Sequence, residues 1–439
     1  MVDKGKPRFF YGWLIVGILI ISMMLTFATR SSFNVFYVAI LDEYGWTHAD
    51  TAGIFSINLI VYGFGGILAG ILMDKLGPRK LFPMAATLIA LGAVWCSQAT
   101  RIWEFYVAFG LIMAFGQCAL GYVPTVTLVN RWFVKRRGLA AGIAMFGFSL
   151  SFLLSPVTQY LRETVGWRAA FLVFAAAVFF IVAPLTGIFT RHRPQDKGLL
   201  PDGAKQPTES ELETRKSYDA SIVDHKWVSV EWTLPRALKT YRLWLLWVAA
   251  MMNGILFNFP QVHQVAFITD VGYSAMFAVA MFSILGLLNG IGPFGGFLSD
   301  RIGRETCFTL GVSSVAIGIL VAFFIRGPGL EWAWYISAAC YGLGLGLSQP
   351  MLPAIYGDLF AGRNLGSIIG FANAGFGVGG ALGPYLAGYI YDVTGSYTLS
   401  FLLVLAAAPI LIAMAWLVAP RKVRLVAGRI SKRPVVTGL

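Results

Sequence analysis

The sequence predicts an all-α polytopic membrane protein with twelve transmembrane helices in two six-helix halves. Its 439 residues are 57% hydrophobic and only 13% charged, and the mean hydropathy is +0.70. Soluble domains carry about 25% charged residues. Apolar runs of about 20 residues, the length that crosses a bilayer as a helix, recur along the chain. A short charged motif also occurs once in each half, which indicates a duplicated unit.

The twelve spans can be assigned in order. In the first half, residues 1–190, they are expected at Tyr11–Val38, Ala52–Met73, Leu81–Ser97, Phe105–Leu128, Leu139–Leu161 and Ala169–Phe189. Residues 191–239 are polar and are expected to form a cytoplasmic linker that is partly helical or mobile. In the second half, residues 240–420, the spans are Leu243–Phe267, Met276–Leu298, Cys307–Phe324, Trp332–Tyr356, Ser367–Tyr391 and Tyr397–Val418. Residues 421–439 form a basic tail that is expected in the cytoplasm.

The repeated motif is a tight turn between the second and third span of each half. The first copy runs from Gly70 to Lys80, and the second starts at Gly296, 226 residues later. In each copy an aspartate at the end of a helix is followed by a glycine and basic residues. The glycine of the first copy, Gly77, is expected to take a positive φ so that the chain reverses within a few residues.

The distribution of basic residues predicts the orientation. All but five of the 34 Lys and Arg lie at the chain ends or in loops on one side of the predicted spans, which is the positive-inside pattern. We therefore expect a monomeric, multi-pass protein of the inner (plasma) membrane with both termini in the cytoplasm. The net charge of +13 follows this pattern and does not predict nucleic-acid binding. The five exceptions are Arg101, Arg162, Arg168 and Arg326, in loops on the outer side, and Arg30, inside the membrane.

Motifs of several other function classes are missing. The four cysteines (Cys96, Cys118, Cys307 and Cys340) lie in apolar spans without paired spacing, so neither a metal site nor a disulfide is expected. The sequence has no phosphate-binding loop, which argues against ATP hydrolysis. No span carries a His/Asp/Glu cluster or a Ser–His pair, so we expect no enzyme and no cofactor. A nutrient receptor of this fold would need a long signalling extension, which the linker and tail do not supply.

Several strings resemble a known family. The Gly70–Lys80 loop resembles the loop between helices 2 and 3 of the major facilitator superfamily. Further strings are similar to bacterial members of the monocarboxylate porter family: Tyr11-Gly-Trp13, Arg30-Ser-Ser-Phe-Asn-Val-Phe-Tyr37, Glu43-Tyr-Gly-Trp46 and the string from Asn130 to Gly142, which is also similar to oxalate–formate antiporters. The resemblance implies two parallel six-helix halves with the substrate between them near the midplane. It also implies a small organic anion, moved with a proton or exchanged for another anion.

Two basic residues that these families commonly carry are absent. An arginine is common in the eighth span, but this chain reads Leu288-Asn-Gly-Ile-Gly292 there. The oxalate–formate antiporters have a lysine in the eleventh span, where this chain has Phe371-Ala-Asn373-Ala. Arg30 is therefore the only candidate to replace the substrate-binding cation. One positive charge suits a monoanion better than a dianion.

Arg30 itself lies about 19 residues into the first span, roughly 28 Å along its axis and towards the outer part of the membrane. An arginine at the membrane centre costs about 2.5–3.5 kcal/mol and needs water or an anion. We expect Arg30 to bind the substrate carboxylate. The alternative is an arginine that reaches the outer surface or pairs with Asp42 or Glu43.

His263 is the only histidine in a predicted span. The halves repeat at an offset of about 230, so Arg30 corresponds to Pro260, three residues before His263, and the two side chains are expected at similar depth. His263 is a candidate for binding substrate or carrying a coupled proton; the alternative is a satisfied polar residue at a helix end. Asp270 is the nearest acid, since no Asp or Glu lies deep in a span. Pro260 is expected to kink its helix and free a backbone carbonyl.

Two further sets of residues are expected to serve the site. The uncharged polar residues that could line a substrate cavity, or equally bridge helices, are Gln117, Tyr122, Asn289, Tyr341, Gln349 and Asn373. The loop residues expected to gate the cytoplasmic side, or merely to set topology, are Asp74, Arg79, Asp300 and Arg301. An aspartate at a helix end can bond the free amides of a neighbouring helix N-terminus, and such a contact would have to break when that side opens.

Together these features predict a secondary active transporter of a small monocarboxylate, similar to lactate or pyruvate, that is proton-coupled and works by alternating access. The expected partners are the organic anion, a proton and the lipid bilayer. The alternatives are an organic-anion exchanger or a carrier of a neutral or drug-like solute.

Overall fold

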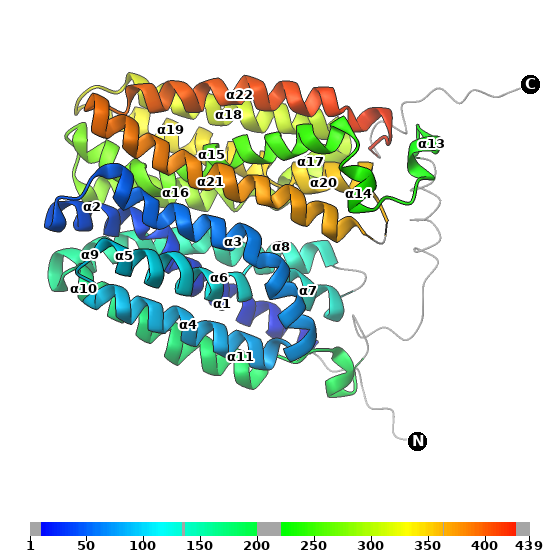
Figure 1. The fold of residues 1–439 in the computed structure, drawn as a ribbon, viewed down its shortest axis with the longest axis horizontal. Helices are drawn as coiled ribbons and strands as arrows, with labels where there is room; N and C mark the ends of the chain where they lie inside the picture. Colours follow the sequence, from blue (N-terminus) through cyan, green and yellow to red (C-terminus); the bar gives the residue numbers. More distant parts are fainter. Residues whose placement is uncertain (1–9, 134–136, 200–220, 363, 427–439) are drawn as a thin grey trace, which may run out of the picture.

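The structure is a computed structural model that describes residues 10–133, 137–199, 221–362 and 364–426. In this part of the chain every regular element is helical, and a single isolated β-bridge joins Ile222 to Arg424. The helices form two bundles that lie side by side (Figure 1). The basic residues predicted near the N-terminus, the centre of the predicted linker and the end of the predicted tail lie outside the described residues.

Six segments of the first bundle correspond to the six spans predicted for the first half. They are α1 (Tyr11–Ser31) with α2 (Phe33–Tyr44); α3 (His48–Leu76); α4 (Pro78–Gln98); α5 (Ile102–Phe105) with η1 (Tyr106–Met113), α6 (Ala114–Ala119) and α7 (Tyr122–Trp132); α8 (Arg137–Ser151) with η2 (Phe152–Leu154) and α9 (Ser155–Val165); and α10 (Trp167–Ala177) with η3 (Val178–Val182) and α11 (Ala183–Phe189).

Six segments of the second bundle correspond to the remaining spans. They are α15 (Tyr241–Asp270), α16 (Ala275–Asn289) with α17 (Gly292–Ile302), α18 (Arg304–Phe324), α19 (Glu331–Ser348) with α20 (Met351–Leu359), α21 (Leu365–Thr394) and α22 (Thr398–Val418). Short helices lie in the predicted linker and tail: η4 (Pro194–Lys197), α13 (His225–Val228), α14 (Leu234–Ala237) and η6 (Pro420–Lys422). We call the face of the molecule that carries these short helices the linker face, and the other the opposite face.

The segment lengths confirm an all-α membrane fold. Among the described residues, nine segments are long and apolar enough to cross a bilayer, and α3 makes a tenth although it bends by 52° between Gly66 and Leu68. The other two segments, α16–α17 and α19–α20, are each interrupted by two residues. Twelve crossings in total are consistent with these bounds.

The turns repeat between the halves as the motif predicts. Gly77, between α3 and α4, has a φ of 69°, and its equivalent Gly303 has a φ of 105°. On the opposite face, Gly166 and Gly395 precede the last helix of each half with φ values of 87° and 67°. Side chains are strained in this region of φ. The glycines therefore allow the chain to reverse in equivalent places.

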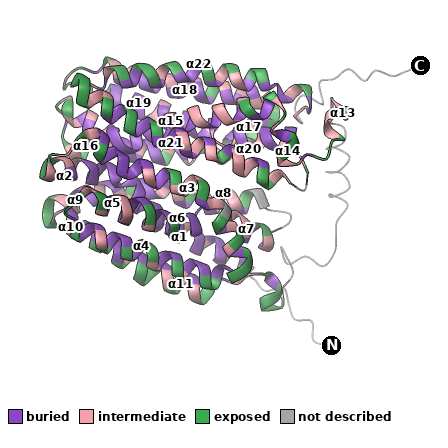
Figure 2. Cartoon of the chain, viewed as in Figure 1, coloured by how far each residue is buried: buried purple, intermediate pink, exposed green. Residues whose placement is uncertain are grey.

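Apolar side chains cover much of the outside of both bundles. Exposed residues line the outward sides of the helices, whereas buried residues gather inside the bundles and between them (Figure 2). Large apolar residues on the outer helices remain highly exposed, among them Leu91 on α4, Phe180 on η3, Ile317 on α18 and Leu417 on α22. Such a surface fits a hydrocarbon solvent, where the backbone is satisfied within each helix.

Each bundle has its own buried core, and a few side chains cross between them. Val35 and Phe152 of the first bundle pack into the second core, while Val262 and Ala266 of α15 pack into the first. The helix α3 packs along α21, α16 packs along α9, and α2 packs against α15. The interface between the halves therefore lies beside the helices that carry Arg30 and His263.

Candidate functional site

Arg30 lies near the middle of the first membrane-crossing segment. The helices α1 and α2 together run from Tyr11 to Tyr44, so the roughly 28 Å between Tyr11 and Arg30 is a little over half of their length. The predicted span ends at Val38, whereas the helical segment continues to Tyr44, so Arg30 lies closer to the middle of this segment than of the predicted span. The side chain is only 6% exposed.

Aromatic rings, not acids, surround the guanidinium of Arg30. Its Cζ lies 4.7 Å from the ring centroid of Tyr62 and 5.5 Å from that of Phe55, both on α3. Cation–π contacts of this kind stabilise a charge without using its N–H groups. Arg30 makes no ion pair or side-chain hydrogen bond with any described residue, so its five N–H donors remain free to meet an anion.

The acids that could have neutralised Arg30 are paired elsewhere. Asp42 lies 2.7 Å from Arg162 and Glu43 lies 2.7 Å from Arg168, all at the opposite face. The alternative in which Arg30 pairs with Asp42 or Glu43 is therefore excluded.

A chain of buried polar side chains holds the helices next to Arg30. Asn58 Nδ2 donates to Gln117 Oε1 (3.1 Å), and Gln117 Nε2 donates to Thr29 Oγ1 (3.2 Å). Asn58 Nδ2 also donates to the carbonyl of Phe109 (2.9 Å). This network connects α1, α3 and α6. Gln117, predicted as a possible cavity residue, is fully buried in it and fixes the residue next to Arg30.

His263 is fully buried in α15 and bonded at both ring nitrogens. Its Nε2 lies 2.8 Å from the carbonyl oxygen of Pro384, and its Nδ1 lies 3.1 Å from Tyr397 Oη. A neutral ring with the proton on Nε2 satisfies both contacts. The ring also packs edge-on against Tyr37, with centroids 5.2 Å apart. Because Tyr37 lies seven residues beyond Arg30, His263 lies nearer the opposite face than Arg30 and does not share its depth.

Pro260 frees a carbonyl, as predicted, but α15 stays continuous from Tyr241 to Asp270. Proline at position 260 cannot donate to the carbonyl of Leu256. Tyr341 Oη donates to that carbonyl instead. Tyr341 thus compensates for the proline inside the second bundle.

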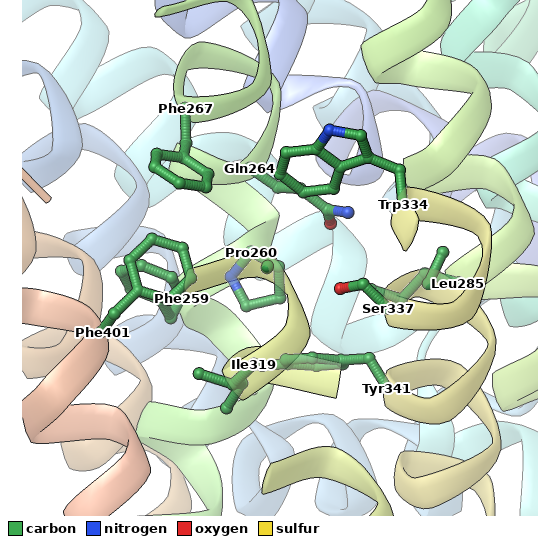
Figure 3. A pocket seen from close by; sticks show the side chains of 12 residues that line it. Phe259, Pro260, Gln264, Phe267, Leu285, Ile319, Trp334, Ser337, Tyr341 and Phe401 are labelled. Atoms are coloured by element: carbon green, nitrogen blue, oxygen red, sulfur yellow. The ribbon is translucent and has the colours of Figure 1, made fainter. Parts of the chain in front are cut away.

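Tyr341 and Pro260 line a small cavity in this bundle, enclosed by α15, α16, α18, α19 and α22 (Figure 3). Its volume is about 30 Å³ and leaves room for water. Aromatic and apolar side chains form most of its wall, and Gln264 and Ser337 add polar atoms. The cavity lies within one half, apart from the interface between the halves.

The other predicted polar residues lie at helix interruptions or on a surface. Tyr122 begins α7, directly after Gly121, where a Cβ would lie 3.0 Å from Tyr62 Oη; this interruption therefore borders the ring above Arg30. Asn289 ends α16, and Gln349 follows α19. Asn373 is exposed on α21.

On the linker face, the charges of the first half pair with one another. Asp74 Oδ1 lies 2.5 Å from Arg131 Nη2, at the end of α7, and not against helix amides as predicted. Arg131 Nη1 lies 2.5 Å from His192 Nε2. Burial, and then the charge of Arg131, lower the pKa of His192, so its ring can accept this bond. Arg79 Nε donates to the carbonyl of Gly187 (3.0 Å).

The second half reverses part of this pattern. Asp300 lies 2.7 Å from Arg304, and Arg304 also contacts Asp358 (3.2 Å) near the end of α20. Asp358 stands 227 residues after Arg131, so an acid replaces the base at the equivalent position and Arg304 bridges two acids. Arg301 stacks on an aromatic ring of its own helix, with Cζ 4.5 Å from the centroid.

Asp392, at the end of α21, joins the two halves at the opposite face. Its carboxylate accepts hydrogen bonds from the backbone N–H groups of His48 (2.9 Å) and Ala49 (2.8 Å), the first two residues of α3. It also lies 2.9 Å from His48 Nδ1. Gly388 allows this approach, because a Cβ there would lie 2.7 Å from the His48 backbone. An acid thus sits on the positive end of a helix dipole, but on the face opposite to the one predicted.

Hydrogen bonds between the halves extend from the opposite face to mid-depth. Ser56 Oγ donates to the carbonyl of Ala381 (2.6 Å), and Ser283 Oγ donates to that of Phe152 (2.8 Å). Asp270, a predicted coupling residue, accepts from a tyrosine of α21 (3.1 Å) within the second half. On the linker face, each ion pair between described residues stays within one half. Among the described residues, the side-chain hydrogen bonds between the halves thus lie at the opposite face and at mid-depth, whereas the ion pairs of the linker face each join residues of one half.

Two residues of this arrangement, Tyr62 and Asp392, are not among those predicted from the sequence. Tyr62 lies at the centre of the predicted span Ala52–Met73, and that central position could have placed its ring opposite Arg30. Asp392 lies one residue beyond a predicted span, where the sequence alone gives no reason to separate it from other loop acids.

Comparisons with known proteins agree with this architecture. The family model for the Major Facilitator Superfamily matches residues 19–360 and 291–437. Monocarboxylate transporter 13 of Rattus norvegicus is 27% identical over 394 residues, covering 89% of this chain and 85% of that protein. Monocarboxylate transporter 2 of Homo sapiens is 26% identical over 423 residues, covering 93% and 84%.

Two solved structures share the fold. A bacterial homologue of the human lysosomal transporter Spinster, in an inward-facing and unoccupied conformation, is 17% identical with a TM-score of 0.67, covering 95% of this chain and 98% of that one. A variant of the nucleoside transporter NupG is 15% identical with a TM-score of 0.66, covering 92% and 100%. The chain belongs to the Major Facilitator Superfamily and is a multi-pass membrane transporter, not an enzyme.

Proposed function

We propose that this chain is a secondary transporter of a small monocarboxylate, with Arg30 as the ligand of the carboxylate. The observation that carries the proposal is a buried, mid-depth guanidinium that has aromatic neighbours and no counter-ion among the described residues. Relatives named monocarboxylate transporters support the substrate class. A bidentate arginine–carboxylate pair uses N–H groups that the cation–π contacts leave free.

The contacts between the halves support alternating access. In the orientation that the basic loops predict, the linker face and both termini are cytoplasmic in the inner (plasma) membrane. The contacts between the halves at Asp392, Ser56 and Ser283 are then those expected of a state that is closed to the outside. Asp74 and Asp300 keep 68% and 52% of their side chains exposed. With Arg79 and Arg301, they remain our candidates for contacts that form between the halves when the cytoplasmic side closes. The transporting unit is taken to be a monomer.

The test is uptake of radiolabelled lactate or pyruvate into proteoliposomes. Removing one partner of a buried charge pair costs about 2–5 kcal/mol, so Arg30→Gln should lower uptake at least about 30-fold. Arg162→Gln, which removes an arginine that already has an acidic partner at the opposite face, should keep most of the activity. Uptake by a folded Arg30→Gln protein close to that of the wild type would overturn the proposal and favour a carrier of neutral solutes.

Anion exchange is the second candidate for the coupling mode. It is favoured because no acid of the described part of the chain pairs with Arg30, and because two hydrogen bonds already occupy the ring of His263. In proton symport, His263 carries the proton, and Asp270 is the weaker candidate. An inward proton gradient should then drive uptake into empty vesicles, and His263→Gln should lose the pH dependence. In exchange, uptake should need an internal carboxylate and ignore the gradient.

A further inference from the structure

Asn34 is the most conspicuous unsatisfied polar side chain near Arg30. It is fully buried in α2, and neither its Nδ2 nor its Oδ1 has a hydrogen-bond partner among the described residues. Burying an amide without partners costs about 1–3 kcal/mol, so such groups call for an explanation. Asn58 and Asn258, the other fully buried asparagines with an unpartnered atom, each use their Nδ2 in a hydrogen bond. Asn34 uses neither atom.

Asn34 lies one helical turn beyond Arg30 on the same face. Side chains at i and i+4 lie one above the other on a helix and tilt towards its N-terminus, so Asn34 leans towards Arg30. The short interruption at Ser32 does not break this register. The N–H of Ser32 bonds to the carbonyl of Ala28, and the N–H of Phe36 bonds to the carbonyl of Ser32.

This face of the helix looks towards the interface between the halves. Arg30 contacts Tyr62 of α3, and Tyr37, one turn beyond Asn34, packs against His263 of α15 in the other half. Asn34 lies between these two positions, where α2 packs against α15. A guanidinium and an amide that have no hydrogen-bond partner among the described residues therefore lie one turn apart near the middle of the Tyr11–Tyr44 segment.

We propose that the side chain of Asn34 forms a hydrogen bond with an oxygen on the carbon next to the substrate carboxylate. The site then selects 2-hydroxy and 2-oxo monocarboxylic acids over acids that lack this oxygen. This inference rests on the proposed function, in which Arg30 holds the carboxylate. A 2-hydroxyl group can donate to Oδ1 and accept from Nδ2, and a 2-oxo group can accept from Nδ2. Asn34 can therefore bind both 2-hydroxy and 2-oxo acids, and does not discriminate between them.

The cost of leaving the Asn34 amide unpaired determines how strongly the site prefers acids that carry the 2-oxygen. A site built to hydrogen-bond a substrate oxygen rejects the analogue that lacks it, because the buried polar group stays unpaired. Lactate and pyruvate should each bind at least about 10-fold more tightly than propionate, which has the same carbon chain without the oxygen. An apolar residue at position 34 should remove this difference, because it should weaken the binding of lactate and pyruvate and leave the binding of propionate unchanged.

The experiment measures how strongly lactate, pyruvate and propionate each inhibit the uptake of radiolabelled lactate or pyruvate into proteoliposomes. The inhibition constants are compared between the wild type and Asn34→Leu. The expected result is a lactate-to-propionate preference of at least about 10-fold that falls to about 1 in Asn34→Leu. The structural control is Asn58→Leu, which breaks the bonds to Gln117 and Phe109 and should change all three acids alike. Asn34→Asp places a carboxylate beside Arg30 and should weaken binding of every acid.

The outcomes separate this inference from the proposed function. If Asn34→Leu weakens lactate and propionate equally, or the wild type does not distinguish them, the role of Asn34 is refuted. The function of Arg30 still stands in that case if Arg30→Gln abolishes binding of both acids. If the folded wild-type protein binds none of the three acids, the proposed function itself is refuted.

Discussion

Asp392 should control which face of the transporter is open. Its carboxylate holds the first two N–H groups of α3 at 2.9 and 2.8 Å and lies 2.9 Å from His48 Nδ1. Opening the opposite face must break all three contacts, because they join the two halves. Hydrogen bonds to a charged group contribute about 1.5–3 kcal/mol each when buried.

Here the side chains of His48 and Asp392 are 28% and 22% exposed, so solvent weakens the contacts. About 1 kcal/mol for each backbone N–H bond gives a total of about 2 kcal/mol. Asp392→Ala should therefore shift the equilibrium towards the state open on the opposite face by about 30-fold. A wild-type open population of about 1% would rise to about a quarter of the molecules. His48→Ala keeps both backbone donors and should have a smaller effect.

The shift can be measured as a distance distribution between spin labels at Val165 and Glu331, which are exposed near the opposite face in different halves. The label cysteines are introduced into a background without the native cysteines. Asp42→Ala is the matched control, since Asp42 is an acid on the same face whose partner, Arg162, lies in the same half. The reasoning is refuted if Asp392→Ala leaves the distances unchanged, or if Asp42→Ala lengthens them equally.

Two further predictions concern stability. Tyr341→Phe should lower the free energy of unfolding by about 1–3 kcal/mol, since it leaves the Leu256 carbonyl unpaired. In a Pro260→Ala background, where residue 260 regains its N–H, the same change should cost clearly less; equal costs in chemical denaturation would contradict the assigned role. For His192, whose folded pKa lies below 6.5, the unfolded chain takes up a proton first as the pH falls through 6.5. Its contribution is thus complete above pH 6.5 and declines below it, so melting temperatures between pH 7.5 and 5 should fall less in His192→Gln than in the wild type, and parallel curves would count against this.

The spans and turns could be predicted because they depend on local sequence. Apolar runs of membrane length, the repeated glycine turn and the alternation of basic loops each report a short stretch of chain. The end of the first helical segment, which sets the position of Arg30 within it, depends on distant residues instead. The predicted span ends at Val38, but Asp42 and Glu43 beyond it pair with arginines more than 100 residues away, and the helix continues to Tyr44.

The site was predicted less well because its contacts are long-range. Gln117 and Tyr341 were singled out correctly as polar residues inside spans, but whether they face a substrate or another helix depends on partners such as Thr29 and the Leu256 carbonyl. The charge–dipole contact was expected at Asp74 and occurs at Asp392. Sequence patterns show that an acid ends a helix, but not which helix N-terminus lies beside it.

The crossing of α3 and α21 gives the molecule the geometry of a lever. At the crossing the backbones nearly touch, since a Cβ on Gly63 would lie 3.0 Å from Gly377 Cα. Gly63 lies about 23 Å along α3 from His48 and about 20 Å from Leu76, so the two arms are nearly equal. Because α3 bends by 52° between Gly66 and Leu68, a rotation about this point reaches the Asp392 end through the straight part of the helix and the Asp74 end across the bend. A side chain at either glycine would lengthen the pivot and loosen both ends at once.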